Sequence, residues 1–476
     1  MLRVQYLRVA NVPPDPVLGN RERCVMLPKT RRCDGVRFAK GPCRLLSSLR
    51  YRLSRLFAHI WVPIGAYAML GLLAAFIAVG LRGLIPSSLA FQIGADAIDG
   101  LLNILASSML AVTTFSLSIM LSAFAVASST ATPRAFQLLK TDRTAQQVLA
   151  SFIGAFIFSL VGIVSLKIGI YGEGGRGILF AATILVLVLI VFNLVRWIGH
   201  LTDFGRLSDI MDRVEVATTD AMTSRLKAPW LGANPIRERN PPQRAIPLPS
   251  PAVGHMQFIN LDRLNTLALN AGCSIYLDVL PGEFVYQGTV LAHVLDGPIG
   301  PAFDTLLADI HASVDIGMER SFDQDPRFGM ITLSEIASRA LSPAINDPGT
   351  AIDVIRRMTR VISLWQDPAA PDVKYPHLWI RGMSSEEILR DAFAAIARDG
   401  AALYEVQIAL QRAFLAMAHL SPGIFANAAA IQSHRAMSYA RGAMPIAKEL
   451  DHLQGVADQI DALATSPTGD ALISKT

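Results

Sequence analysis

Four long apolar segments constrain this chain more than any other feature of its sequence. Each is long enough to cross a bilayer as an α-helix, and their few charged residues lie near the segment ends. A mean hydropathy of +0.39 and a charged fraction of only 17% fit the same class of protein. The sequence therefore predicts a polytopic α-helical membrane protein with four transmembrane helices, at Ile60–Leu81, Leu101–Ser128, Leu149–Ile170 and Ile178–Ile198.

Basic residues alternate between the connections, which predicts the orientation of these helices. Residues 1–59 contain 13 Lys/Arg against three Asp/Glu, and the connection after the second segment carries Arg134, Lys140 and Arg143. The connections after the first and third segments carry one basic residue each. Because basic loops stay in the cytoplasm, we expect both termini there and the basic head against anionic lipid.

Composition divides the chain further. The expected parts are a disordered basic tail (1–45), a four-helix transmembrane domain (46–200), a helical stalk with a Pro-rich linker (201–253), a small β module (254–300) and a helical cytoplasmic domain (301–476). The fourth span is expected to continue into the stalk, and the seven prolines in Ala228–Ala252 predict an extended linker. Whether the tail belongs to the native chain stays open.

The β module is predicted from three runs rich in β-branched and aromatic residues. HMQFI, CSIYLDVL and GEFVYQGTVLAHV read as strands, the last bent at Gly288, and Asn260 can cap a helix over Leu261–Asn270. The third run resembles half of a biotinyl or lipoyl domain, but residues 254–296 contain no lysine to carry such a group. We therefore expect no cofactor.

Downstream of Ala302 the sequence predicts helices separated by capped corners. The expected helices are Phe303–Arg320, Ile331–Leu341, Thr350–Gln366, Ser384–Asp399, Leu403–His419, Phe425–Ala440 and Pro445–Ala464. RALSPAINDPGTA, at Arg339–Ala351, reads as a rigid corner in which Ser342-Pro343 ends one helix and Asp347 caps the next. A capping box of Thr350 and Asp353 is a rival start. Ala344 and Ile345 are expected to bury the turn.

Two groups of residues are candidate sites. Ser107, Thr114, Ser118 and Ser122 form one hydroxyl stripe along the second span, suited either to helix packing or to lining a pore. The second group is a charged nest of Arg320, Asp323, Asp325, Arg327, Asn346 and Asp347. A salt-bridge and capping network, a hard-cation site, a phosphorylated-ligand site and a protein contact are all compatible with the nest.

Several stretches resemble a family of bacterial predicted membrane proteins that carry a domain-of-unknown-function label. They include FSLSIMLSAFAVASSTATPRAF, PGEFVYQG and MERSFDQDPRFGMITLSEIASRALSPAINDPGTA, of which ALSPAINDP is the most specific. The resemblance covers most of the chain from about Leu45. It implies a membrane protein with a cytoplasmic region, which agrees with the multi-pass bacterial inner (plasma) membrane protein expected from the spans, and it implies no reaction, ligand or catalytic residue.

The sequence favours a channel-like or transport-related assembly with a cytoplasmic regulatory domain, built as a homo-oligomer in the lipid bilayer. The alternative is a membrane-anchored sensor or scaffold that binds an ion, a small ligand or a partner through its cytoplasmic helices. An enzyme is not expected, because the chain lacks Walker A, H-E-x-x-H and G-x-S-x-G motifs. Nucleic acid is not expected either, because the excess of basic residues lies in the tail. No metal site is expected, since Cys24, Cys33 and Cys43 are too widely spaced for zinc.

Overall fold

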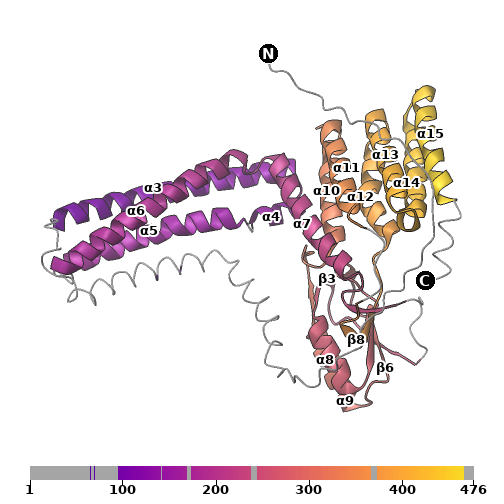
Figure 1. The fold of residues 1–476 in the computed structure, drawn as a ribbon, viewed down its shortest axis with the longest axis horizontal. Coiled ribbons are helices and arrows are strands. Elements are labelled where there is room, and N and C mark those ends of the chain that lie inside the picture. The colour runs from indigo at the N-terminus through magenta and orange to yellow at the C-terminus, as the bar shows by residue number, and fades with distance from the viewer. Residues whose placement is uncertain are drawn as a thin grey trace, which may run out of the picture. The chain divides into compact units, whose positions relative to one another are not determined.

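The computed structural model describes residues 65, 69, 95–140, 142–168, 173–236, 244–365 and 372–465. The expected tail, 1–45, lies outside these residues, and so does the first expected span apart from Gly65 and Met69. The described part is mainly helical and also contains two small β-sheets (Figure 1). The prediction of mainly helical structure with a β component is confirmed.

Three helices form an apolar bundle, and they are α3 (Ala95–Thr130), α5 (Arg143–Lys167) and α6 (Glu173–Asp203). Within the described residues these three are long and apolar enough to cross a membrane, over 96–128, 144–167 and 176–202. Figure 1 shows them running side by side. Their shared core includes Leu105, Phe152 and Trp197, and the Trp197 indole donates to Ser116 Oγ at 2.9 Å. They correspond to the second, third and fourth expected spans, whereas the count of four spans stays a prediction.

The expected continuation of the fourth span into a stalk is wrong. Helix α6 ends at Asp203, and a separate helix, α7 (Leu207–Lys227), follows. Gly205 adopts φ +82°, and a Cβ at that position would lie 2.9 Å from the Ala123 side chain of α3. Glycine is required there because it adopts positive φ without a steric cost and lets the two backbones approach. The chain therefore turns where α6 meets α3.

A second, larger core joins the end of the bundle to a helical domain. This domain contains α10 (Pro326–Ala340), α11 (Pro348–Ile362), α12 (Ser385–Asp399), α13 (Tyr404–Leu420), α14 (Pro422–Ala443) and α15 (Ala447–Ala464). The short helix α4 (Pro133–Lys140) and α7 both pack against it. One buried cluster runs from Ala127 in α3 to Ile460 in α15.

The strands form two sheets that draw on distant parts of the chain. The five-stranded sheet has the order β1-β8-β4-β6-β2, and the three-stranded sheet has the order β5-β3-β7. Helices α8 (Leu261–Ala271) and α9 (Pro301–His311) share a core with the larger sheet. The strand bounds are Ala233–Pro235 (β1), Ile246–Pro249 (β2), Gly254–Ile259 (β3), Ser274–Leu277 (β4), Phe284–Val285 (β5), Val290–Leu295 (β6), Val314–Gly317 (β7) and Tyr375–Ile380 (β8).

Three expectations about this region need correction. The segment expected to be an extended linker supplies β1 and β2, so the β structure is not confined to 254–300. The bent third strand is two strands in different sheets, separated at Gly288, where φ is +87°. The expected helix Phe303–Arg320 ends at His311, because Val314–Gly317 pairs with β3 instead.

Candidate functional site

The four hydroxyl residues of the predicted stripe all lie exposed along α3. Ser107 and Thr114 each donate to a backbone carbonyl one turn earlier, both at 2.9 Å, and Ser118 does so at 3.0 Å. Such bonds satisfy a hydroxyl within its own helix. The opposite face of α3 is buried in the bundle through residues such as Leu105 and Met109. The stripe is therefore a continuous face that the described helices leave uncovered.

One part of the predicted nest is a buried ion pair. Arg320 Nε donates to Asp325 Oδ2 at 2.9 Å, and Asp325 also caps α10 by accepting from the Phe328 amide. The Asp325 side chain is only 2% exposed, and this burial raises the pKa of its carboxyl against the opposing effect of Arg320. Gly282 crosses so close to the pair that any side chain there would overlap it. This part of the nest is a capping network.

Arg327 and Asp323 face other partners. Arg327 bridges to α12, donating to Asp391 Oδ2 at 2.7 Å and to Glu387 Oε2 at 2.5 Å. Asp323 is exposed and accepts from the Ser321 hydroxyl at 2.8 Å. The arginine therefore holds α10 against α12, and Asp323 stabilises its own turn.

Asn346 and Asp347 do not belong to the nest. The Asp347 amide donates to Ala340 O at the C-terminal end of α10, whereas Asp325 caps its N-terminus. A helix of 15 residues is about 22 Å long at 1.5 Å per residue. Asp323, Asp325 and Asp347 therefore cannot surround one cation, and the expected single nest is two separate caps.

The corner itself is capped as predicted. Asp347 accepts from the Thr350 amide at 3.0 Å, whereas Asp353, of the rival capping box, pairs with Arg357. The expectation that Ala344 and Ile345 bury the turn is wrong, because both are exposed. The turn is closed instead by backbone bonds from residues 345 and 346 to Ser342 O, with Asn346 at φ +50°.

Two further groups were not identified from the sequence. Arg225 of α7 is 3% exposed and donates to Gln324 O at 3.1 Å, while its Nε and Nη1 atoms have no hydrogen-bond partner in the described structure. Its burial lowers the pKa of the guanidinium to about 10. Arg225 falls on the same helix face as buried Thr218, Ala221 and Met222, and this spacing is the signal that could have revealed it.

The second missed group joins the bundle to α7, and we call it the α5–α7 junction. Asp142 caps α5 by accepting from the Ala145 amide at 2.6 Å, and it also ion-pairs with Arg213 of α7. His200 Nε2 of α6 lies 3.2 Å from the same carboxylate. Arg213 in turn pairs with Asp209 at 2.9 Å. One buried carboxylate therefore links three helices.

Helix α4 makes a parallel set of links from the bundle. Arg134 pairs with Glu335 of α10, and Gln137 donates to Glu319 Oε2 at 3.1 Å. Arg339 donates to Ala131 O at 3.1 Å. These contacts join the connection between α3 and α5 to α10 and to Glu319, two residues after β7.

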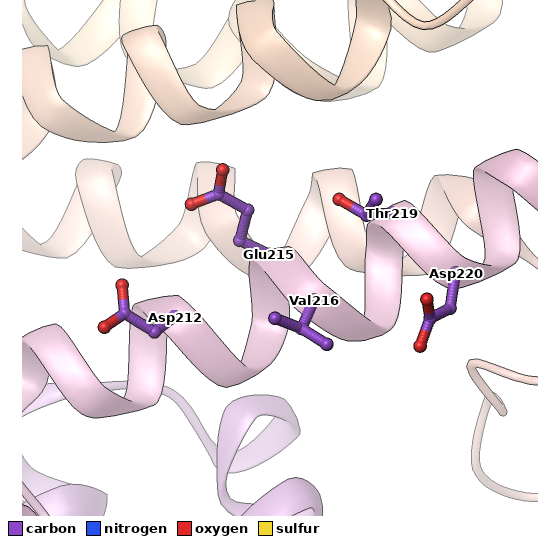
Figure 2. A pocket seen from close by; sticks show the side chains of 5 residues that line it. All are labelled: Asp212, Glu215, Val216, Thr219 and Asp220. Carbon is purple, nitrogen blue, oxygen red and sulfur yellow. The ribbon is translucent and has the colours of Figure 1, made fainter.

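A shallow hollow of about 270 Å³ lies along α7 and is lined by Asp212, Glu215, Val216, Thr219 and Asp220 (Figure 2). Two of its acids are already paired, because Arg357 of α11 donates to Asp212 and to Glu215. Arg360 donates to Glu215 as well, at 2.7 Å. The hollow is therefore the open side of an ion-pair network that holds α11 against α7.

Comparisons with known proteins identify a membrane protein family, which agrees with the apolar helices. A family described as "Predicted membrane protein (DUF2254)" matches residues 58–416. Relatives include the uncharacterized proteins Rv1290c of Mycobacterium tuberculosis and Mb1321c of Mycobacterium bovis, each 27% identical over 363 residues, covering 74% of this chain and 68% of the relative. No solved structure matches the chain. The family resemblance predicted from ALSPAINDP is confirmed, and the chain belongs to this predicted membrane protein family.

Proposed function

We propose that this membrane protein is a channel-like or transport-related homo-oligomer whose helical domain regulates the membrane helices. In this proposal four helices cross the bacterial inner membrane and both termini lie in the cytoplasm. The observation that carries the proposal is the hydroxyl stripe on α3, which is exposed in a single chain although it belongs to an apolar helix.

The chemistry of the stripe is suited to a water-filled pore between subunits. Small residues let two membrane helices approach closely, which favours association through this face. Each hydroxyl that donates to its own helix keeps its oxygen free to accept from water or to face a cation. The regulatory role rests on the α5–α7 junction, because a displacement of α7 would be transmitted to α5 through Asp142.

The test is electrical. Purified protein reconstituted in planar bilayers is expected to give discrete conductance steps, and Ser118→Leu is expected to reduce or abolish them by filling the path with an apolar side chain. Ala181→Leu is the matched control, because Ala181 is exposed on a different apolar helix, α6. The proposal would be contradicted if the wild-type protein gave no conductance with several ions and voltages. It would also be contradicted if both variants reduced the conductance equally.

A sensor or scaffold is the second candidate, and the double connection of the bundle to α10 and α7 favours it. Arg134–Glu335 and Asp142–Arg213 give a ligand on the helical domain two routes to the membrane helices. Thermal-shift screening of the full chain in detergent against cations, nucleotides and phosphorylated metabolites tests this role. A chain that no compound stabilises, and that shows conductance, would favour the first candidate.

A further inference from the structure

Three large apolar side chains gather at one end of the three-stranded sheet and stay exposed. Phe284 is 43% exposed, Tyr286 66% and Met318 81%. The Phe284 and Tyr286 rings lie 5.1 Å apart in an edge-to-face arrangement, and His255 packs against Phe284 at 4.9 Å. We call Phe284, Tyr286 and Met318 the aromatic patch. Phe284 and Tyr286 lie on one side of β3, and Met318 follows β7 on the other side. Exposed apolar side chains grouped at one end of a sheet favour an interaction surface.

The patch is held by strand pairing. His255 of β3 pairs with Phe284 of β5 on one side and with Gly317 of β7 on the other. The Gln257 side chain lies over Gly317, where any Cβ would overlap it, and donates to Glu319 O at 2.6 Å. The backbone on both sides of Met318 is therefore held by Gln257.

The same sheet end is attached to α4. Glu319, next to Met318, accepts from Gln137 of α4 at 3.1 Å, and Arg134 one turn earlier pairs with Glu335. Helix α4 is the short connection between the apolar stretches of α3 and α5, which end at Ser128 and begin at Thr144. The aromatic patch therefore lies beside the loop that joins two candidate membrane spans.

The length of α5 places this loop relative to the bilayer. Its apolar stretch has 24 residues, about 36 Å at 1.5 Å per residue, against a hydrocarbon core of about 30 Å. The Thr144 end then lies within several ångströms of the hydrocarbon boundary. Asp142 and α4 fall in the headgroup layer, which adds about 5–8 Å on each side of the core. A patch fixed to α4 is within reach of the same layer.

We propose that Phe284, Tyr286 and Met318 form a membrane-contact surface that enters the headgroup region of the bilayer crossed by the apolar bundle. Aromatic rings with a polar end are favoured at that depth, and a flexible thioether adapts to lipid. The contact would hold the three-stranded sheet against the membrane next to α4. The inference needs the bundle to cross the bilayer, but it does not depend on conduction through α3.

The experiment measures lipid contact in the full chain. The four native cysteines are replaced by serine, or by alanine at buried Cys273, and single cysteines are introduced as Tyr286→Cys or Met318→Cys. Each is labelled with a fluorophore in nanodiscs containing lipids that carry a shallow nitroxide quencher. Ile299→Cys is the matched control, because Ile299 is an apolar residue 92% exposed on the loop before α9.

Labels at 286 and 318 are expected to lose severalfold more fluorescence to the lipid-borne quencher than the label at 299, while a water-soluble quencher shows the opposite order. Equal lipid quenching at all three positions would overturn the proposal. Protection from both quenchers at 286 and 318 would overturn it too, because the patch would then be covered by protein, such as a second copy. The quenching results do not depend on whether the protein conducts ions. A failure of the proposed conductance can therefore be distinguished from a failure of the proposed membrane contact.

Discussion

Asp347 is a single carboxylate on which the ALSPAINDP corner depends. It accepts from both the amide and the hydroxyl of Thr350, and these bonds lower the pKa of the carboxyl. The Asn-Asp-Pro spacing was sufficient to predict this cap, because a cap depends on residues close in sequence. The exposure of Ala344 and Ile345 was not predictable in the same way, since burial depends on which elements arrive from elsewhere.

We expect Asp347→Ala to lower the stability of the protein by about 1 kcal/mol, the usual cost of losing an N-cap, with Asp347→Asn costing less because asparagine also caps. Since the folded pKa is lowered, the ionised cap contributes its stability above the ordinary aspartate pKa. That contribution is lost as the pH falls through the folded value. Thermal denaturation at neutral and acidic pH checks this. A gap between wild type and Asp347→Asn that widens on acidification would contradict the sign.

Arg225 illustrates the opposite case, a buried cation that costs stability. Removing a guanidinium from water is unfavourable unless it is well paired, and only one of its three nitrogens has a partner in the described structure. Arg225→Met is therefore expected to raise the free energy of unfolding at neutral pH by roughly 1–3 kcal/mol. The lowered pKa, about 10, means that the gain shrinks as the pH rises above that value.

Denaturation of Arg225→Met and wild type at pH 7 and pH 11 gives the measurement. Arg263→Met is a suitable control, because Arg263 makes a half-exposed ion pair with Asp309 and its loss should change stability little. Destabilisation by Arg225→Met would mean that the bond to Gln324 O outweighs the burial cost.

Among the elements, the crossing of α7 over α10 depends on one glycine. A Cβ at Gly329 would overlap the Thr218 hydroxyl and lie 2.7 Å from its Cβ, and Thr218 is fully buried. Gly329→Ala is therefore expected to destabilise the protein by about 1–3 kcal/mol, the usual cost of overpacking. Adding Thr218→Ala removes two of the three clashing atoms and should recover part of the loss. Strictly additive effects in the double variant would argue against this close crossing.

The elements also show where prediction from sequence succeeds and where it stops. The apolar helices were found because hydropathy over twenty residues is a local signal. The break at Gly205 was missed, since it is imposed by Ala123, more than eighty residues earlier. Strand β8 was missed because Pro376 lies inside it, and a proline within a run argues against a strand.

For the whole molecule, the orientation of the membrane helices is the prediction with the widest consequences. Cells carrying single-cysteine variants at Gly174, in the first turn of α6, and at Gln459, on the exposed face of α15, can be treated with a membrane-impermeant thiol reagent. Charge bias predicts that only Gly174→Cys reacts in intact cells and that Gln459→Cys reacts after lysis. Reaction at Gln459→Cys in intact cells would contradict the predicted orientation.

The largest buried cluster does not follow the divisions that composition suggested. It contains Ala127 near the end of α3, Ala131 just after it, Phe204 after α6, and residues of α7 and of α10–α15. A sequence shows where composition changes, but it does not show which distant segments share a core. A fragment that begins at residue 254 would therefore lack α7, β1 and β2, all of which pack against what remains.

The strand order of the larger sheet has a consequence for biosynthesis. Strand β8 lies between β1 and β4, although it is the last of the five to be made. Until residues 375–380 leave the ribosome, β1 has no neighbour and one edge of β4 is open. Unpaired edges of this kind recruit other chains. Nascent or prematurely terminated chains that lack β8 are consequently the species most prone to aggregate and the ones that chaperones and proteases need to bind.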